Sequence, residues 1–273
     1  MTRFFYYNQV ENFGDAINPY LAERVFGLKT CWSAPGSAVL CGVGSILHFF
    51  LCRKHKLSGY LSPLFAPPVH VWTSGFVCEP SAKYRLQRRL NVHALRGRLS
   101  QAAVERLAGK KADVPLGDGG LLFSRLLEKR PAKRHALGII PHVADAGNPV
   151  FARLQEAVPH AAIIDMRADP LLVLEQIAAC DCVVSTAMHG LIAADSLGIP
   201  NRWIEVSDKV VGGGFKFRDY YSVFDVPAPT PLRLNDSTPF SRGTVDGIMR
   251  DYRVPAKAVE SVQNALYNAF PRL

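Results

Sequence analysis

Residues 183–200, VVSTAMHGLIAADSLGIP, contain the transition from strand to helix that decides the fold. The apolar, partly β-branched residues at the start are typical of a buried strand, which we expect over residues 182–184. The later residues predict a buried helix over residues 190–197, followed by Gly198 and Pro200, which commonly lie just beyond a helix end. The segment is therefore a strand–turn–helix unit, the building block of a parallel α/β sheet.

The turn of this unit contains Ser185, Thr186 and His189. The first N–H groups of a helix have no partner within the helix and carry the positive end of its dipole, so such a turn binds anions. His189 follows Ser185 by four residues, which places both side chains on one face of the opening turn. A histidine beside hydroxyls at a strand end is a candidate for chemistry, and we predict a functional role for His189.

The same alternation of apolar runs and helical patterns continues toward both ends of the chain. We expect strands over residues 3–7, 38–43, 69–73, 92–95, 114–116, 137–140, 162–165 and 203–206. We expect helices over residues 16–26, 100–107, 121–128, 170–179 and 256–270, and one after Pro149. Asp15 has the position of an N-cap, and residues 208–218 are glycine-rich and read as a mobile loop.

Residues 128–135, EKRPAKRH, are charged and contain a proline, as linkers often do. They divide the chain into an N-terminal Rossmann-like domain, residues 1–130, and a C-terminal Rossmann-like domain with terminal helices, residues 131–273. The predicted fold class is α/β, with two domains that face each other across a cleft. Ligands of such sheets bind beyond the carboxyl ends of the strands. The polar and glycine residues at these ends are Asn12, Asp15, Gly44, Ser45, Ser74, Arg96, Asp118, His142, Arg167, Ser185 and His189.

The composition excludes several classes of protein. Of 273 residues, 48% are hydrophobic and 20% charged, so the chain can form a core and is not a disordered protein. The net charge of +9 favours an anionic partner, while the absence of a basic helix or an aromatic RNA motif argues against nucleic acid. The six cysteines form no CxxC pair and are expected to be reduced. No HExxH, DxD or Cys/His cluster predicts a metal site.

The sequence predicts a cytoplasmic protein. No apolar run approaches the ~20 residues of a membrane span, and the first residues lack the apolar core of a signal peptide. Residues 46–51, ILHFFL, precede a basic group at residues 53–56, RKHK, and this arrangement allows two interpretations. The favoured one is a core segment with a basic end. The alternative is peripheral contact with the anionic cytoplasmic face of the inner membrane.

Four short segments give the chain a resemblance to a known family. They are NFGDAIN at residues 12–18, GVGS at residues 42–45, LRGR at residues 95–98 and MHGLIAAD at residues 188–195, with weaker matches LGD at 116–118 and IIPH at 139–142. In this order the chain resembles the bacterial polysaccharide pyruvyl transferases, which build pyruvate ketals on exopolysaccharides. The resemblance implies a GT-B-like fold, phosphoenolpyruvate as donor, no further cofactor, and a lipid-linked oligosaccharide as acceptor.

One position departs from the family pattern. Many relatives carry arginine two residues before the motif histidine, where this chain has Ala187. A guanidinium contact to the donor from this turn is therefore missing. The candidates to replace it are Arg96, Arg167, Arg202 and Lys216, because a phosphate and a carboxylate need several cations.

Ketal formation needs an acid and a base, and these roles can be assigned to particular residues. We expect His189 to protonate the donor methylene or to relay a proton from a sugar hydroxyl. We expect Asp118 to orient a base and His142 to line the cleft. The expected substrate-binding residues are Arg96, Ser185, Thr186, Arg167, Lys216 on a lid, Asn12, Asp15, Gly44 and Ser45.

Two other functions fit the same pattern. One is a GT-B-type glycosyltransferase that uses a nucleotide sugar, for which Glu205 is the residue that would hold the ribose. The other is a protein that binds a glycan or a phosphate without catalysis. A shared fold does not separate these functions from pyruvyl transfer.

Overall fold

The computed structural model describes residues 1–54, 66–227, 229–235 and 237–273, and its two main sheets are parallel with five strands each. The first sheet consists of β1 (Thr2–Phe5), β2 (Thr30–Trp32), β3 (Leu40–Cys41), β5 (Val69–Trp72) and β7 (Leu90–Ala94). The second consists of β8 (His135–Ile140), β9 (Ala161–Ile163), β10 (Cys180–Ser185), β11 (Asn201–Glu205) and β12 (Leu232–Arg233). A separate antiparallel pair joins β4 (Leu51–Arg53) to β6 (Tyr84–Leu86).

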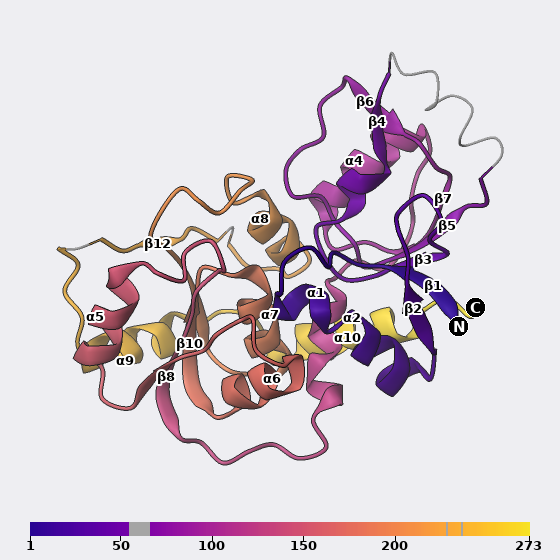
Figure 1. Cartoon of the computed structure of the whole chain (residues 1–273). Helices are drawn as coiled ribbons and strands as arrows, with labels where there is room; N and C mark the ends of the chain where they lie inside the picture. The colour runs from indigo at the N-terminus through magenta and orange to yellow at the C-terminus, as the bar shows by residue number, and fades with distance from the viewer. Residues whose placement is uncertain (55–65, 228, 236) are drawn as a thin grey trace.

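Helices connect the strands and cover the sheets (Figure 1). The α-helices are α1 (Phe13–Ala16), α2 (Asn18–Tyr20), α4 (Arg98–Ala108), α5 (Pro149–Ala157), α6 (Pro170–Ala178), α7 (Met188–Ser196), α8 (Phe215–Tyr221), α9 (Arg242–Asp251) and α10 (Ala256–Asn268). Tighter or wider turns are the π-helix η1 (Leu21–Val25) and the 3₁₀ helices η2 (Leu47–Phe50) and η3 (Gly119–Leu126). The prediction of a mixed, Rossmann-like α/β protein with parallel sheets is confirmed.

The two sheets share one strand order. It runs β2-β1-β3-β5-β7 in the first sheet and β12-β11-β10-β8-β9 in the second. When the strands of each sheet are numbered by themselves, both orders become 2-1-3-4-5. The chain therefore reverses direction across the sheet between β1 and β3, and again between β8 and β10. Doubly wound sheets bind ligands at this switch point, because the connections there leave in opposite directions and open a crevice.

The first connection differs from the helix expected over residues 16–26. Asn12 is the N-cap of α1 and Asp15 lies within its first turn, so the expectation that Asp15 caps a helix was wrong. Pro19 has no N–H to donate and begins the separate turn α2, and the chain then widens into η1. Several short turns therefore replace one regular helix.

Two further expected elements take another form. Residues 114–116 are not a strand, and Leu116 makes one isolated bridge to Leu95. The helix expected over residues 121–128 is the 3₁₀ helix η3, which begins two residues earlier. Its first two residues pack too closely for side chains, because a Cβ on Gly119 would lie 2.7 Å from the ring of Trp72 and one on Gly120 2.7 Å from Ile192.

The glycine-rich loop is shorter than the sequence indicated. Gly214 has a φ of 74°, and α8 begins directly after it. Lys216 therefore lies in the first turn of a helix, between the buried Phe215 and Phe217, and not in the loop that the sequence indicated, and its place on a lid stays a prediction. The physical reason is that the two aromatic side chains have a core to pack against.

A continuous hydrophobic core joins the two sheets. Phe13 of α1 belongs to the same buried cluster as Ile140 of β8 and Val183 of β10, and its N–H donates to the Met166 carbonyl at 2.7 Å. Figure 1 shows α1 beside α7, although the two are far apart in the sequence. The first connection of the chain is therefore built into the second half of the molecule.

The end of the chain returns to the first sheet. The indole N–H of Trp72 donates to the Leu266 carbonyl of α10 at 3.0 Å, and Phe270 stacks on Phe26 with ring centroids 3.7 Å apart. The two termini consequently lie close together (Figure 1). The division at residue 130 separates the strands of the two sheets but not the helices that cover them, and it stays a prediction.

The apolar segment at residues 46–51 lies mainly in the core. Ile46, Leu47 and Phe50 are buried, whereas Phe49 is 40% exposed. Part of the basic group that follows lies outside the described residues, so peripheral membrane contact stays a prediction. None of the helices in the described ranges is both long and apolar enough to cross a membrane.

Candidate active site

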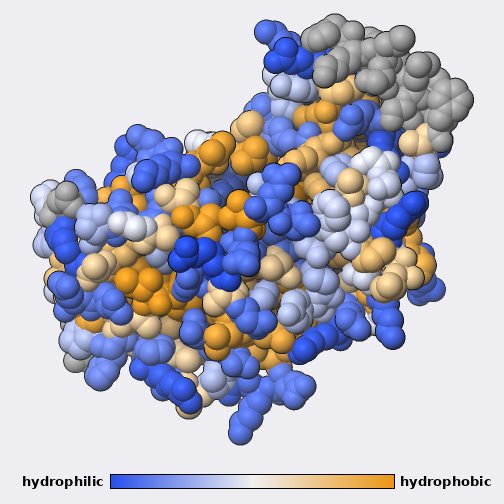
Figure 2. Space-filling view, viewed as in Figure 1, coloured by the Kyte–Doolittle hydropathy of each residue, from blue (hydrophilic) through white to orange (hydrophobic). Residues whose placement is uncertain are grey.

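A cleft of about 450 Å³ lies between the two sheets, at the carboxyl ends of their strands. Both halves of the chain contribute to its wall. Its polar lining consists of Tyr7, Asn12, Asp15, Ser45, His48, His142, His189 and Lys216. Seen from outside, the molecular surface is indented between the part that contains α4 and the part that contains α8 (Figure 2).

The cleft forms where the two switch points meet. Asn12 and Asp15 follow β1, and Ser45 follows β3, so they flank the reversal in the first sheet. His142 follows β8 and His189 follows β10, so they flank the reversal in the second. The side chains that line the cavity thus come from the four loops that this strand order brings together.

His189 occupies the first turn of α7, with Ala187 as the N-cap residue. The side chain is nearly buried, and its Nε2 has no hydrogen-bond partner among the described residues. The ring fits because Gly14 has no side chain, since a Cβ there would lie 1.8 Å from Nδ1. Burial, followed by the charges of Lys216, Arg96 and His142, lowers the pKa of His189 to about 3.

Asp118 faces this imidazole from beneath the cleft. Its Oδ2 lies 3.9 Å from His189 Nε2, beyond hydrogen-bonding distance, and also has no partner in the described part of the chain. Its Oδ1 accepts from the Gly120 N–H at 2.9 Å and caps η3. Burial raises the pKa of Asp118 to about 6, which Arg96 opposes. The carboxylate and the imidazole thus face each other without a hydrogen bond between them.

Two further basic groups surround the imidazole. Burial and the charge of Arg96 lower the pKa of Lys216 to about 8. Burial and the charge of Lys216 lower the pKa of His142 to about 4. In the described residues no hydrogen bond or ion pair holds the Lys216 ammonium. Each basic group thus lowers the pKa of the next, and the charges of Asp15 and Asp145 oppose this effect at Lys216.

Arg96 lies behind the cleft wall and does not line it. It is fully buried, pairs with Asp219 at 2.9 Å and donates to Ser45 Oγ at 2.6 Å and to the Phe76 carbonyl. Asp219 also accepts from the N–H and the hydroxyl of Ser100. The geometry therefore does not support the expected direct clamp on a donor. Arg96 instead fixes Ser45, and its charge reaches the cleft through the wall.

The other residues predicted in the first half lie in the cleft wall or directly behind it. Asn12 Nδ2 donates to Asp15 Oδ2 at 2.7 Å, and both side chains line the cleft. Burial raises the pKa of Asp15 to about 6, against the effects of Asn12 and Lys216. Gly44 backs this carboxylate, because its Cβ would lie 3.2 Å from Asp15 Oδ1, and its φ of 131° is one that other residues rarely adopt.

Two expected binding residues lie elsewhere. Ser185 is fully buried, and its hydroxyl is engaged by the carbonyls of Ile140 and Ala187. The hydroxyl of Thr186 accepts from the His142 N–H at 2.7 Å and lines a neighbouring pocket. Neither hydroxyl lines the cleft, contrary to the expectation that Ser185 and Thr186 bind the substrate. A hydroxyl at the end of a buried strand is needed to satisfy backbone groups.

The arginine candidates of the second half also lie outside the cleft. Arg167 is exposed and forms a bidentate pair with Asp165, at 2.9 Å for the shorter contacts. Arg202 lines a separate pocket together with Tyr221 and Tyr252. Of the four cations considered for the donor, only Lys216 lines the cleft.

Sequence reasoning missed His48 and Asp219. His48 lines the cleft, and its Nδ1 accepts from the Val77 N–H at 3.3 Å. Burial, then Arg96, lowers its pKa. A polar residue within an apolar run was the available signal. Asp219 has no such signal, because its partner Arg96 is distant in the sequence. Among the described residues, no group of three or more His, Cys, Asp or Glu is arranged to hold a metal ion.

Comparisons with known proteins place the chain in a family. A family model described as polysaccharide pyruvyl transferase matches residues 43–208. A protein of Acanthamoeba polyphaga mimivirus, named uncharacterized protein L143, is 33% identical over 226 residues, which cover 81% of this chain and 74% of that protein. The matched range includes Ser45, Asp118, His142 and His189 but not Lys216.

Proposed function

Because the chain belongs to the polysaccharide pyruvyl transferase family and is therefore a transferase, we propose that it transfers pyruvate from phosphoenolpyruvate to two hydroxyls of one sugar. The products are a pyruvate ketal and inorganic phosphate. We propose that the acceptor is a lipid-linked oligosaccharide of exopolysaccharide biosynthesis. The glycosyltransferase alternative is not favoured, because the family match indicates pyruvyl transfer and the Glu205 carboxylate proposed for a ribose is paired with Arg233 at 3.4 Å.

One observation carries the choice of donor. His142, His189 and Lys216 converge on one cleft, and within the described residues no carboxylate contacts any of them at hydrogen-bonding distance. An anion that enters between them pairs with the Lys216 ammonium and favours the protonated forms of the two imidazoles. Phosphoenolpyruvate has a phosphate and a carboxylate, so it offers more than one charge to this set.

The start of α7 offers a second means of holding an anion. Ala187, the N-cap residue, has no side-chain oxygen to bond the first N–H groups of the helix. Ala187, Met188 and His189 all line the cleft. We therefore propose that the donor phosphate binds to the N-terminus of α7 and to Lys216, and that a small residue at position 187 leaves room for it.

His189 would then change its protonation with the ligand. In the free protein its pKa is about 3, so the imidazole is neutral. A bound anion favours the imidazolium, and the nearby Asp118 carboxylate stabilises it. His189 protonates the methylene carbon of the donor, and the resulting electron-poor carbon accepts the first sugar hydroxyl. The same imidazole then takes the proton of that hydroxyl and is restored.

The second half of the reaction closes the ketal. The second hydroxyl attacks the same carbon as the bond to the phosphate oxygen breaks, and its proton leaves with the phosphate. Asp15 and Asn12, on the opposite wall of the cleft, accept hydrogen bonds from and donate them to the acceptor. We further propose a GT-B-like pairing of the two sheets, which their shared strand order supports.

The test is an incubation of the full chain with phosphoenolpyruvate and a panel of methyl glycosides. We expect phosphate release that depends on the glycoside, and a product heavier than the glycoside by pyruvate minus water. UDP-sugars tested in parallel should release no nucleotide. Release of nucleotide without any release of phosphate from phosphoenolpyruvate would contradict the proposal. Presenting the same sugar on a polyprenyl diphosphate tests the lipid-linked acceptor.

A further inference from the structure

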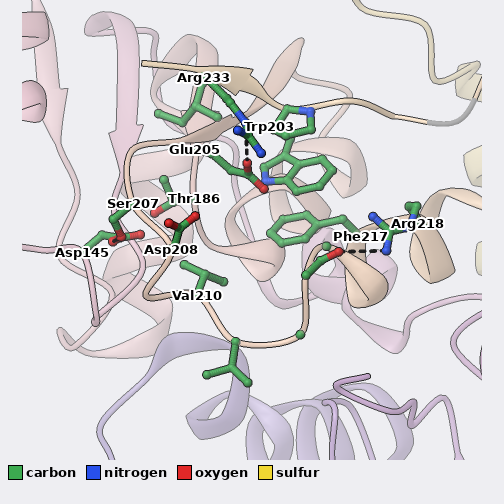
Figure 3. Close-up of a pocket in the computed structure, with 16 residues that line it drawn as sticks. Asp145, Thr186, Trp203, Glu205, Ser207, Asp208, Val210, Phe217, Arg218 and Arg233 are labelled. Carbon is green, nitrogen blue, oxygen red and sulfur yellow. Dashed lines mark hydrogen bonds and ion pairs between the residues drawn. The ribbon is translucent and has the colours of Figure 1, made fainter. Parts of the chain in front are cut away.

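A second pocket of about 380 Å³ opens beside the cleft, at the carboxyl end of β11 (Figure 3). Its volume is within the range of about 300–1,000 Å³ that holds small ligands. Its polar lining includes Asp145, Glu205, Ser207, Asp208, Arg218 and Arg233. The proposed reaction assigns no role to this pocket.

The pocket and the cleft share one wall. Thr186 lines the pocket and the next residue, Ala187, lines the cleft. Phe217 lines the pocket and Lys216 lines the cleft. Asp145 lines the pocket, and its N–H donates to the carbonyl of His142 at 2.7 Å in the turn after β8. A ligand in the pocket is therefore separated from the basic groups of the cleft by single side chains.

Asp145 is the group that points to a ligand. The residue is only 2% exposed, yet its Oδ2 has no hydrogen-bond partner among the described residues. Its Oδ1 accepts from the Ser207 hydroxyl at 2.5 Å, which fixes the carboxylate while the second oxygen stays buried without a partner among the described residues. A buried carboxylate oxygen without a partner is costly, so a donor from outside the chain is expected to satisfy it.

The chemistry of the lining identifies the class of ligand. Asp145, Asp208 and Glu205 make one side rich in carboxylates, and Figure 3 shows Asp145, Ser207 and Asp208 grouped together. Arg233 is already paired with Glu205, and Arg218 donates to the Gly213 carbonyl at 2.8 Å. Carboxylates repel a phosphate but accept hydrogen bonds, often two at once, from the neighbouring hydroxyls of a sugar ring.

The loop that closes the pocket reaches the other half of the molecule. Gly212 has a φ of 104°, and a Cβ there would lie 2.2 Å from the carbonyl oxygen of Val77. Val77 itself lines the cleft. Val211, beside it, is 70% exposed at the mouth of the pocket. Glycine at position 212 therefore allows one loop to border both cavities.

We propose that this pocket is a subsite for a second, neutral sugar ring of the acceptor, next to the ring that reacts in the cleft, and that hydroxyls of this second ring donate to the Asp145 carboxylate. The inference rests on the proposed function, because it assigns the second substrate of that reaction to a place next to the first. An acidic subsite beside a basic cleft keeps the two substrates apart. The carboxylates repel the anionic donor, and a neutral sugar has no charge for the basic groups of the cleft to bind.

The test measures the KM for each of the two substrates and compares how a substitution changes them. With the methyl glycoside of a disaccharide that gives the fastest phosphate release, Asp145→Asn should raise the KM for the glycoside at least tenfold and change the KM for phosphoenolpyruvate less than twofold. Asp181→Asn removes the same charge from an exposed position of β10 outside both cavities, and should change neither value. Equal shifts in both KM values, or none, would overturn the proposal.

Two additions keep the test decisive. If Asp145→Asn does not fold, Asp208→Asn, at the exposed rim, should raise the KM for the glycoside several-fold. If no glycoside supports phosphate release, the proposed function fails by itself. The subsite is then tested by saturation-transfer NMR with methyl galactoside, glucoside and mannoside. Transfer to at least one sugar that is lost in Asp145→Asn supports the subsite, and absence of transfer to the wild-type protein refutes it.

Discussion

Two cations near the cleft show how differently the same kind of group is used in the two halves of the protein. Arg96, which follows β7, is fully buried and its charge is matched by Asp219. Lys216, at the start of α8, lines the cleft without an ion pair among the described residues. The paired cation links the two halves, whereas the unpaired one faces the open cleft. The charge of a side chain therefore does not by itself identify a binding residue. It matters whether that charge is already paired with another group of the chain.

The same distinction separates the carboxylates. Asp219 is fully engaged by Arg96 and Ser100. Asp118 has one free oxygen that faces a neutral imidazole. Groups that are satisfied within the chain should matter for stability, and groups that are left unsatisfied should matter for turnover. The following experiments test this division.

The largest effect is expected for His189→Asn. Loss of a positioned acid–base group typically reduces kcat by about 10²–10⁴-fold. The thermal unfolding midpoint should stay close to that of the wild type, because Nε2 makes no hydrogen bond within the described residues. Phosphate release from phosphoenolpyruvate measures the first quantity and calorimetry the second. His160→Asn, at an exposed histidine, is the matched control. A variant with near wild-type kcat would remove His189 from the chemistry.

Asp219→Asn should instead act on folding. It leaves the buried Arg96 guanidinium without its counter-charge, and breaking such a pair costs about 3–5 kcal/mol. Urea denaturation measures the free energy of unfolding, and Asp225→Asn, at an exposed carboxylate just beyond α8, is the control. A fall of less than about 1 kcal/mol would mean that the paired cation does not hold the halves together.

Lys216→Met should weaken donor binding. A charge-assisted hydrogen bond contributes about 1.5–3 kcal/mol, which corresponds to a rise of roughly 10- to 100-fold in the KM for phosphoenolpyruvate. Lys216→Arg should recover part of this loss. Lys257→Met, on the exposed side of α10, should change nothing. In the wild type kcat/KM should fall above pH 8, because the pKa of Lys216 is about 8 in the free protein. An unchanged KM in Lys216→Met would place the donor elsewhere.

The smallest effect concerns stability and pH. Burial raises the pKa of Asp118 from 3.8 to about 6, so between these values the folded chain binds more protons than the unfolded chain. Stability from this group is full below pH 4 and is lost as pH rises through 6. Asp118→Asn abolishes that loss, so its stability relative to wild type should increase between pH 4 and pH 7. Denaturation curves at both pH values measure the difference, and a decrease would show that Asp118 has a stronger cationic partner.

The candidate site was predictable wherever local pattern carries the signal. The glycine-bearing turns after β1, β3, β8 and β10 can be read from short apolar runs that end in polar residues, and this identified Asn12, Ser45, His142 and His189. The helix at Lys216 was missed because three glycines outweighed the two aromatic residues that flank the lysine. Arg96 lies at a strand end, as predicted. Its role was predicted wrongly because its partner, Asp219, is 123 residues away in the sequence.

The sequence by itself determined the alternation of strands and helices, the α/β class, and the loops that contain polar groups, because these depend on neighbours within a few residues. Only the tertiary structure decided the strand order of each sheet, which loops meet, and which charges find a partner. Those outcomes depend on contacts between residues far apart in the chain, such as Arg96 with Asp219 and Gly14 with His189. Whether a buried charge is neutralised within the fold or left for a ligand is settled at those contacts.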